Sequence, residues 1–338
     1  MAHSKKLLLM SIVFFVLSLI PLNSHAQSGE LEGFGQLRGA GTVSVEITPE
    51  FPIPNAATSV KLITYNTDLD KARISWTIGG KAIKSGVGEK TLTFTTGPLG
   101  KTSLVMATIY TKEGYVMIKE IPITPLEVNF LWEAMTYVPP FYKGKAGYGY
   151  GSVARVIAFP EFFKAGTRIS NSNLVYKWSI NGRVAQDASG YGKNFLDVPE
   201  QIFPKSIAVE VEVKSFDGTL AVKKEVVLEP VQPKVLVYEN NPLYGILAQK
   251  SLANNYTLVG NEITISAIPY FFSATERTGS DMQYRWSLNN RDLGLQDNAD
   301  ITLRSETGKG GGSRVSLEVK NAATALQYTN NDFSVSYK

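Results

Sequence analysis

Three short segments of this chain repeat one pattern, and they constrain its fold more than any other feature. They run from Arg73 to Gly80, from Tyr176 to Gly182 and from Tyr284 to Asn290, and each carries a tryptophan in alternating sequence that ends in a Gly/Asn turn. The tryptophans, Trp76, Trp178 and Trp286, are 102 and 108 residues apart, which is about the length of one small domain. The spacing predicts three tandem β-sandwich domains, each with a strand-borne tryptophan in its core.

The sequence around these segments supports an all-β fold. Stretches such as Val43 to Ile47 and Ile207 to Val213 alternate apolar and polar residues with period two, as half-buried strands do, and helical periodicity is absent over any useful length. We predict domains at 43–124, 125–230 and 231–338. Prolines at both junctions, 122–125 and 230–233, stiffen them and predict a semi-rigid rod.

The N-terminus has the features of a secretory signal peptide. Lys5 and Lys6 precede an apolar run from Leu7 to Ile20, and Ser24-His25-Ala26 supplies small residues for cleavage, so we predict a signal at 1–26. The alternative is an uncleaved membrane anchor. We expect the Gly-rich residues 27–42 to form a linker. The signal also predicts export to the periplasm, the cell surface or the extracellular space.

Composition limits the chemistry that the exported chain can perform. It contains no cysteine, and its two histidines, His3 and His25, lie in the predicted signal. The commonest general base and the usual transition-metal ligands are therefore missing, and no local motif marks a carboxylate pair. Net charge falls from +4 to about +2 when Lys5 and Lys6 leave, which does not favour nucleic-acid binding. We expect a non-enzyme without a cofactor or metal. The alternative is calcium binding by the acidic loops at Asp68–Asp70 or Asp297–Asp300.

The tryptophan motif, followed some thirty residues later by an alternating valine hairpin with a Gly-containing turn, resembles bacterial Ig-like domains. The nearest subtype is the PKD-like (polycystic-kidney-disease-type) domain. The Asp-Gly turn typical of that subtype is replaced by Gly-Gly, Asn-Gly and Asn-Asn, and the antibody-type cysteine pair is missing. The resemblance implies a repeat protein of the bacterial envelope that acts as a spacer, an adhesion module or a subunit of a surface assembly.

Aromatic insertions in the second and third domains are the candidate binding sites. Leu236 and Tyr238 match Phe130 and Trp132, and an insertion follows in each domain, whereas domain 1 has a shorter connection. Exposed tyrosines on Gly-hinged loops suit glycan or protein recognition, so we expect partner contacts at Tyr142, Tyr148, Tyr150 and Tyr244. The alternative is that these loops fold back and cover a sandwich edge or a neighbouring domain.

Three functions follow as hypotheses. The first is a non-enzymatic surface or envelope protein that binds a protein or glycan. The second is a purely structural spacer or a subunit of a pilus-like assembly. The third is an envelope hydrolase, which would need carboxylates that converge in a cleft.

Overall fold

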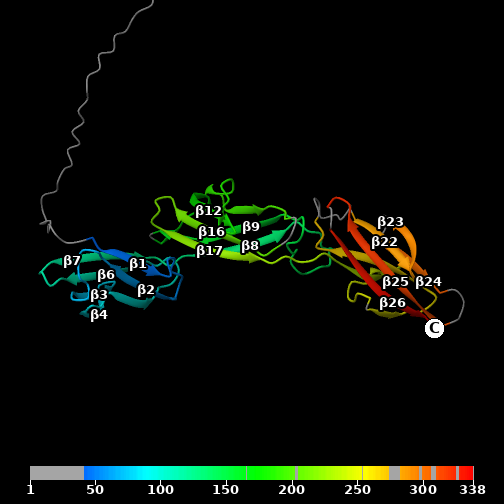
Figure 1. Cartoon of the computed structure of the whole chain (residues 1–338), viewed down its shortest axis with the longest axis horizontal. Helices are drawn as coiled ribbons and strands as arrows, with labels where there is room; N and C mark the ends of the chain where they lie inside the picture. Colours follow the sequence, from blue (N-terminus) through cyan, green and yellow to red (C-terminus); the bar gives the residue numbers. More distant parts are fainter. Residues whose placement is uncertain are drawn as a thin grey trace, which may run out of the picture. The chain divides into compact units, whose positions relative to one another are not determined.

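The computed structural model describes residues 42–164, 166–201, 205–252, 254–273, 282–296, 299–305, 310–324 and 327–337. The chain divides into two units, 1–40 and 41–338, and the second is described below. The predicted signal peptide and nearly all of the linker lie outside the described residues. The described part is built from sheets in which nearly all strand pairs are antiparallel (Figure 1), and its helical segment is a 3-10 turn at Asn171–Asn173. No helix in that part is long and apolar enough to cross a membrane.

Domain 1 is a sandwich of two sheets around Trp76. One sheet has the order β1-β2-β5, and the other has the order β4-β3-β6-β7. The strands are β1 (Ser44–Thr48), β2 (Ala57–Ile63), β3 (Arg73–Ile78), β4 (Lys81–Val87), β5 (Thr91–Thr95), β6 (Ser103–Tyr110) and β7 (Val116–Ile123). Strand β4, which follows the tryptophan strand β3, pairs with β3 in the same sheet. In constant-type Ig domains the corresponding strand belongs to the opposite sheet.

Domain 2 repeats this order with additional short strands. One sheet is β15-β9-β8, the other is β13-β12-β16-β17, and β14 also pairs with β12. Its strands are β8 (Glu127–Ala134), β9 (Ala154–Glu161), β10 (Phe163–Lys164), β11 (Thr167–Arg168), β12 (Leu174–Ile180), β13 (Arg183–Val184), β14 (Gly190–Tyr191), β15 (Phe195–Val198), β16 (Ile207–Ser215) and β17 (Ala221–Leu228).

Domain 3 again has two sheets, ordered β19-β18-β21-β24 and β20-β26-β25-β22-β23. Strand β20 pairs parallel with β26, while the other pairs are antiparallel. The strands are β18 (Lys234–Asn241), β19 (Gly245–Ile246), β20 (Asn255–Thr257), β21 (Glu262–Tyr270), β22 (Met282–Leu288), β23 (Arg291–Gln296), β24 (Asp300–Arg304), β25 (Gly311–Asn321) and β26 (Tyr328–Tyr337).

Each domain has its own hydrophobic core, and the repeated tryptophan lies in it. Trp76, Trp178 and Trp286 are fully buried, each within a separate cluster of aliphatic and aromatic side chains. The indole N–H of Trp76 donates to the Glu89 carbonyl oxygen at 2.7 Å, and that of Trp178 donates to the Lys193 carbonyl at 2.9 Å. The tryptophan strands therefore form the scaffold, as expected for an Ig-like fold.

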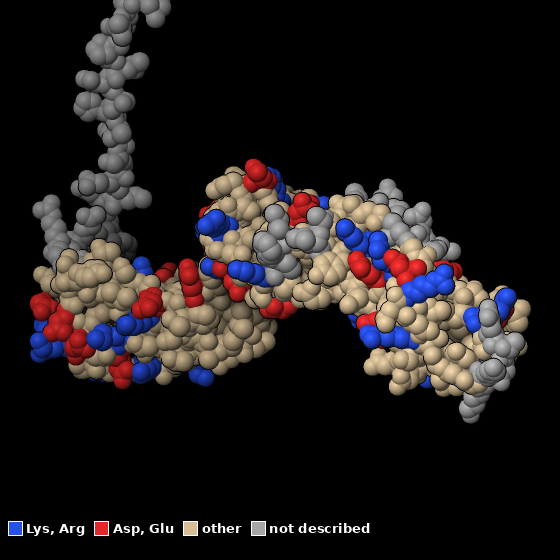
Figure 2. Space-filling model, turned by 45° about the vertical axis from the view of Figure 1, so that its right-hand side comes forward, with Lys and Arg blue, Asp and Glu red and all other residues tan. Residues whose placement is uncertain are grey.

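Charged side chains of both signs are interspersed on the face shown in Figure 2. Many face each other across the strands of one sheet, as in the Lys223–Glu210 and Arg304–Glu262 ion pairs at 2.8 and 2.7 Å. Such exposed cross-strand pairs contribute little stability. Because positive and negative side chains are interspersed, the visible face carries no large patch of one charge.

Candidate functional site

The connection between the first two main strands of domain 2, residues 135–153, packs against domain 3. Tyr142 lies edge-on to Tyr270 and Phe271, with ring centroids 5.6 and 5.7 Å apart, a geometry that aromatic pairs favour. Phe141 approaches Tyr238 in the same way at 5.6 Å. These contacts belong to one apolar cluster shared by the two domains, which we call the second joint.

Backbone hydrogen bonds fix this connection to the end of β21. The Tyr137 N–H donates to the Phe272 carbonyl at 2.7 Å, and the Phe271 N–H donates back to the Tyr137 carbonyl at 2.7 Å. The exchange holds Phe271 at a φ of 63°, a left-handed conformation that is unusual for a bulky residue. Because this backbone conformation is unfavourable for phenylalanine by itself, the contacts around Phe271 must hold it there.

Buried polar side chains complete the second joint. Gln327 is 1% exposed and donates from Nε2 to the Tyr150 carbonyl at 2.7 Å. Its Oε1 accepts from the Ser273 N–H at 3.0 Å and from Asn321 Nδ2 at 2.7 Å, while Ser273 Oγ donates to the Gly151 carbonyl at 2.6 Å. When all members of a buried hydrogen-bond network have partners, the network favours one arrangement of the segments that it connects, here the insertion of domain 2 and the end of domain 3.

Close packing explains the glycines of the Gly147-Tyr148-Gly149-Tyr150-Gly151 segment. A Cβ on Gly149 would lie 3.0 Å from the Val231 carbonyl oxygen and 3.5 Å from that of Phe271. A Cβ on Gly147 would meet the Val231 side chain. These glycines allow close backbone approach, and the expectation that they act as hinges is wrong.

The structure corrects the expectation that the domain 2 tyrosines are presented to a partner. Tyr148 is fully buried in the core of domain 2, and burial raises the pKa of its phenol. Tyr142 and Tyr150 are half-buried within the second joint. The alternative, that this insertion folds back on its neighbours, describes what these residues do.

Tyr244, the remaining predicted contact residue, lies on the surface of domain 3. It is 78% exposed at the tip of the β18–β19 hairpin, and its neighbour Leu243 is 85% exposed. Asn241 Oδ1 accepts from the N–H groups of Leu243 and Tyr244 at 2.9 and 3.3 Å, so the tip has a defined turn conformation.

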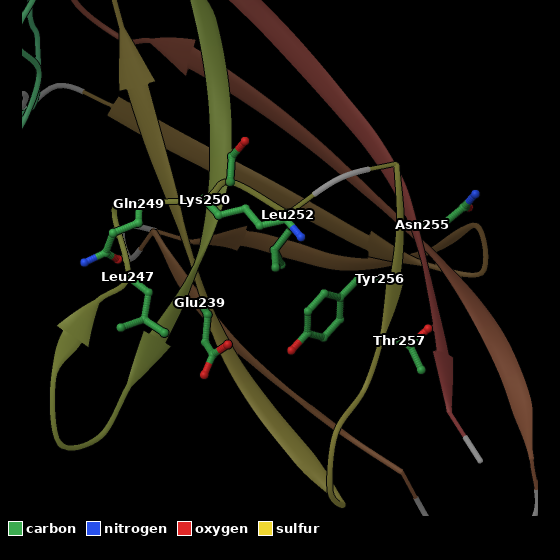
Figure 3. A pocket seen from close by; sticks show the side chains of 9 residues that line it. Glu239, Leu247, Gln249, Lys250, Leu252, Asn255, Tyr256 and Thr257 are labelled. Carbon is green, nitrogen blue, oxygen red and sulfur yellow. The ribbon is translucent and has the colours of Figure 1, made fainter.

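A pocket of about 440 Å³ lies behind this hairpin, between β18 and β20, and we take it as the candidate functional site (Figure 3). The volume is within the range of small-ligand sites. It is lined by Glu239, Leu247, Gln249, Lys250, Ser251, Leu252, Asn255, Tyr256 and Thr257.

Tyr256 and Glu239 give the pocket its chemical character. Figure 3 shows the Tyr256 hydroxyl directed toward the Glu239 carboxylate from the opposite strand. Burial, and then the nearby negative charge of Glu239, raise the pKa of Tyr256, so the phenol stays protonated as a donor at neutral pH. Lys250 and Gln249 add donors at the rim, and Leu247 and Leu252 add apolar surface.

A difference between the repeats accounts for the pocket. The two repeats can be aligned by the proline that each carries in its second main strand, Pro160 in domain 2 and Pro269 in domain 3. Trp132 pairs with the residue four positions before Pro160, and Glu239 pairs with the residue four positions before Pro269. Glu239 therefore occupies the place of Trp132, and the predicted match of Tyr238 to Trp132 is wrong by one residue. In domain 2 the indole packs against the core, with the Lys145 ammonium 3.2 Å from its ring centre. The smaller glutamate leaves this region open in domain 3.

The acidic loops considered for calcium show competing partners. Asp68 pairs with Lys71 and Asp70 pairs with Lys90, both at 2.7 Å, and the pKa of Asp68 is lowered chiefly by its hydrogen bond to Lys71. Asp297 and Asn298 lie outside the described residues. Within the described part of the chain, no group of three potential metal-binding side chains comes together.

No family model matches the chain, and no curated protein matches it. Among solved structures, it matches the three N-terminal domains of the highly immunogenic outer capsid protein of bacteriophage RB49 at 12% identity, over 88% of this chain and 99% of that one, with a TM-score of 0.24. The central fibronectin-III array of RIM-binding protein matches at 9% identity, over 88% and 97%, with a TM-score of 0.30.

A third matching structure is SGBP-B from the mixed-linkage glucan utilization locus of Bacteroides ovatus, in complex with a mixed-linkage heptasaccharide. It matches at 14% identity, over 87% of this chain and 70% of that one, with a TM-score of 0.20. The matched structures include tandem arrays of immunoglobulin and of fibronectin-III domains. The fold of this chain is given by its own sheet orders, which are those of all-β, tandem Ig-like sandwich domains.

Proposed function

We propose that this chain is a non-enzymatic, exported surface or envelope protein that binds a carbohydrate in the domain 3 pocket. One observation carries the proposal: the pocket combines an aromatic ring, Tyr256, with the polar groups of Glu239, Gln249 and Lys250. In an adhesion role, the other domains would hold this pocket away from the cell.

The chemistry of sugars fits this set of residues. A pyranose ring has an apolar C–H face that packs on an aromatic side chain, and hydroxyl groups around its rim that need hydrogen-bond partners. Tyr256 offers the ring, the Glu239 carboxylate accepts, and the Lys250 ammonium donates. A few convergent polar groups on a partly apolar surface are typical of small-ligand sites.

Binding without turnover is favoured by the number of carboxylates. Glycoside hydrolysis generally uses two carboxyl groups on opposite sides of the bond that is cut. Among the described residues that line this pocket, Glu239 is the one carboxylate. The pocket can therefore accept sugar hydroxyls without supplying a matched acid and base.

A structural role is the second candidate, and the second joint favours it. The buried contacts of Gln327, Ser273 and Phe271 with domain 2 connect neighbouring domains through specific side chains. A chain built in this way would serve as a spacer or as a subunit of a surface assembly.

A glycan array followed by calorimetry on the best ligand tests the proposal. Tyr256→Ala should abolish binding, and Glu239→Trp should also abolish it by filling the pocket as Trp132 does in domain 2. Tyr328→Ala, which removes a 63% exposed tyrosine of domain 3 outside the pocket, is the matched control. Equal binding by wild type and Tyr256→Ala would refute this site.

A further inference from the structure

The joint between domains 1 and 2, which we call the first joint, shares one feature with the second joint, although the residues that form it are not at equivalent positions of the two repeats. In each, an aromatic side chain just after the second main strand of the later domain packs on the loops at the end of the earlier domain. At the first joint this residue is Phe163, which lies so close to Gly100 of domain 1 that a Cβ there would be 2.8 Å from the Phe163 Cβ. At the second joint it is Phe271, against Tyr142.

Domain 1 also carries an aromatic side chain just after its second main strand, and among the described residues no neighbouring domain covers it. Tyr65 lies two residues after the second main strand, β2, and is 94% exposed. Strand β2 begins beside the loop whose Pro52 carbonyl accepts from the Leu126 N–H of domain 2. Because a strand of seven residues spans about 23 Å, Tyr65 lies at the opposite end of domain 1 from the first joint.

Domain 3 carries an open receiving surface at its end away from the second joint. A largely apolar hollow of about 280 Å³ lies there. Its lining includes Leu258, Leu288, Leu293, Leu303 and Tyr337, together with polar side chains such as Arg304 and Ser305. Strands β22 and β24 end at this hollow, and β21 begins near it and runs to Phe271 at the other end.

Exposed apolar side chains gather at the same end of domain 3. Leu243 and Tyr244 form the hairpin tip beyond β18, and Val259 precedes β21; they are 85%, 78% and 86% exposed. In domains 1 and 2 the equivalent connections, 49–56 and 135–153, contact the next domain. Exposed apolar residues that lie together usually mark a contact surface.

We propose that the domain 3 hollow binds Tyr65 of a second copy of this chain, so that copies associate head to tail. The proposal extends the contact seen at the two joints, where an aromatic side chain packs on the end of the preceding domain. Tyr65 of domain 1 offers such a side chain, and the hollow and hairpin tip of domain 3 offer an apolar surface that could receive it. A contact between two different surfaces is heterologous, and repeated copies form open chains unless the rotation closes a ring.

The interface is expected to be weak in solution. One aromatic side chain buries roughly 150–250 Å², whereas a stable interface buries at least about 1,000 Å², so the hairpin tip at Leu243 and Tyr244 must contribute as well. Association should therefore be reversible and depend on protein concentration. The hollow is separate from the Tyr256 pocket, and this inference does not require carbohydrate binding.

Sedimentation velocity of the purified protein over a wide concentration range tests the proposal. We expect the average mass to rise with concentration, and we expect Tyr65→Ala and Leu293→Asp each to weaken association by at least about tenfold. Both side chains are exposed, at 94% and 42%, so neither change should unfold a domain; circular dichroism checks this. Tyr191→Ala, at a 57% exposed position in domain 2, should associate like the wild type.

A mixture of the two variants distinguishes this contact from a symmetric one. Tyr65→Ala retains the hollow, and Leu293→Asp retains the tyrosine, so an equimolar mixture should form one-to-one dimers that cannot grow further. A wild-type protein that stays monomeric at every concentration would overturn the proposal. Association that survives Tyr65→Ala, or a mixture that stays monomeric, would also overturn it.

Discussion

Replacing Gly149 with alanine tests whether the second joint is closely packed. Gly149 does not have the left-handed backbone that favours glycine, so alanine introduces no backbone strain and changes only the occupied space. The new Cβ would lie 3.0 Å from the Val231 carbonyl oxygen and 3.5 Å from that of Phe271. Both contacts are backbone atoms, which cannot rotate away as a side chain could.

The cost follows from how firmly those backbone atoms are held. The Val231 N–H donates to the Tyr148 carbonyl at 2.7 Å, and the Phe271 N–H donates to the Tyr137 carbonyl at 2.7 Å. Only the contact with the Val231 carbonyl is shorter than an ordinary van der Waals contact, so its relief must displace the Val231 backbone and strain the hydrogen bond that holds it. Overpacking of this kind costs about 1–3 kcal/mol, which corresponds to roughly a 5- to 140-fold increase in the open population of the joint.

Native-state hydrogen exchange at the Val231 and Phe271 amides measures this opening directly. Both amides should exchange faster in Gly149→Ala, while amides in the core of domain 1 keep their wild-type rates. Gly97→Ala is the control, because its Cβ would meet nothing closer than 3.7 Å and Gly97 also lacks a left-handed backbone. Unchanged exchange in Gly149→Ala would refute the close-packing explanation.

Three further predictions concern the cores and one turn. Tyr148 is fully buried and its hydroxyl has no partner among the described residues, so Tyr148→Phe should preserve stability in urea unfolding while Tyr148→Ala loses about 3–5 kcal/mol; equal losses would contradict a packing role. Trp178→Phe should cost about 1 kcal/mol more than Trp286→Phe in the unfolding of their domains, because within the described residues the Trp178 indole N–H has an acceptor and that of Trp286 has none. The Lys164 ammonium and neighbouring hydroxyls hold the pKa of Asp217 well below its usual range. The stability that Asp217 contributes is therefore complete above the unfolded pKa of about 4 and is lost as the pH falls toward the lower folded pKa. Hydrogen exchange of the turn amides against pH measures this loss, and a pH dependence that persists in Asp217→Asn would exclude Asp217 as its source.

The sequence predicts the fold well where the structure depends on local pattern. The tryptophan segments and the alternating segments at β16 and β25 form strands as predicted, because period-two alternation places one face of each strand in the core. Strand β16 also pairs with β17 in the hairpin that the sequence predicts. The short strand β20 was not predicted. It pairs parallel with β26 across 79 residues of sequence, Asn255 with Ser334, and three residues carry no pattern that identifies such a distant partner.

The candidate tyrosines show why local composition does not determine exposure. The sequence around Tyr148 and Tyr150 has the glycines of a mobile loop, but those glycines provide space for the Val231 and Phe271 backbones. This contact depends on domain 3, more than eighty residues away from Tyr148 in the sequence. Tyr244 has the same local signals and is exposed, since the equivalent surface of domain 3 receives no domain of this chain within the described residues.

A shift of one residue between the repeats explains why sequence comparison does not identify Glu239 as part of the candidate site. By sequence, Tyr238 matches Trp132 because both are aromatic, and this match hides the substitution that opens the pocket. The strand pairings instead place Glu239 at the position of Trp132, so a core-facing indole in domain 2 becomes a carboxylate beside Tyr256 in domain 3. A carboxylate at a position that packs against a core is costly unless it gains a partner, and the pocket exposes Glu239 to a ligand. The departure from the repeat pattern is therefore the strongest reason to locate function in domain 3 rather than in the tyrosine-rich insertion of domain 2.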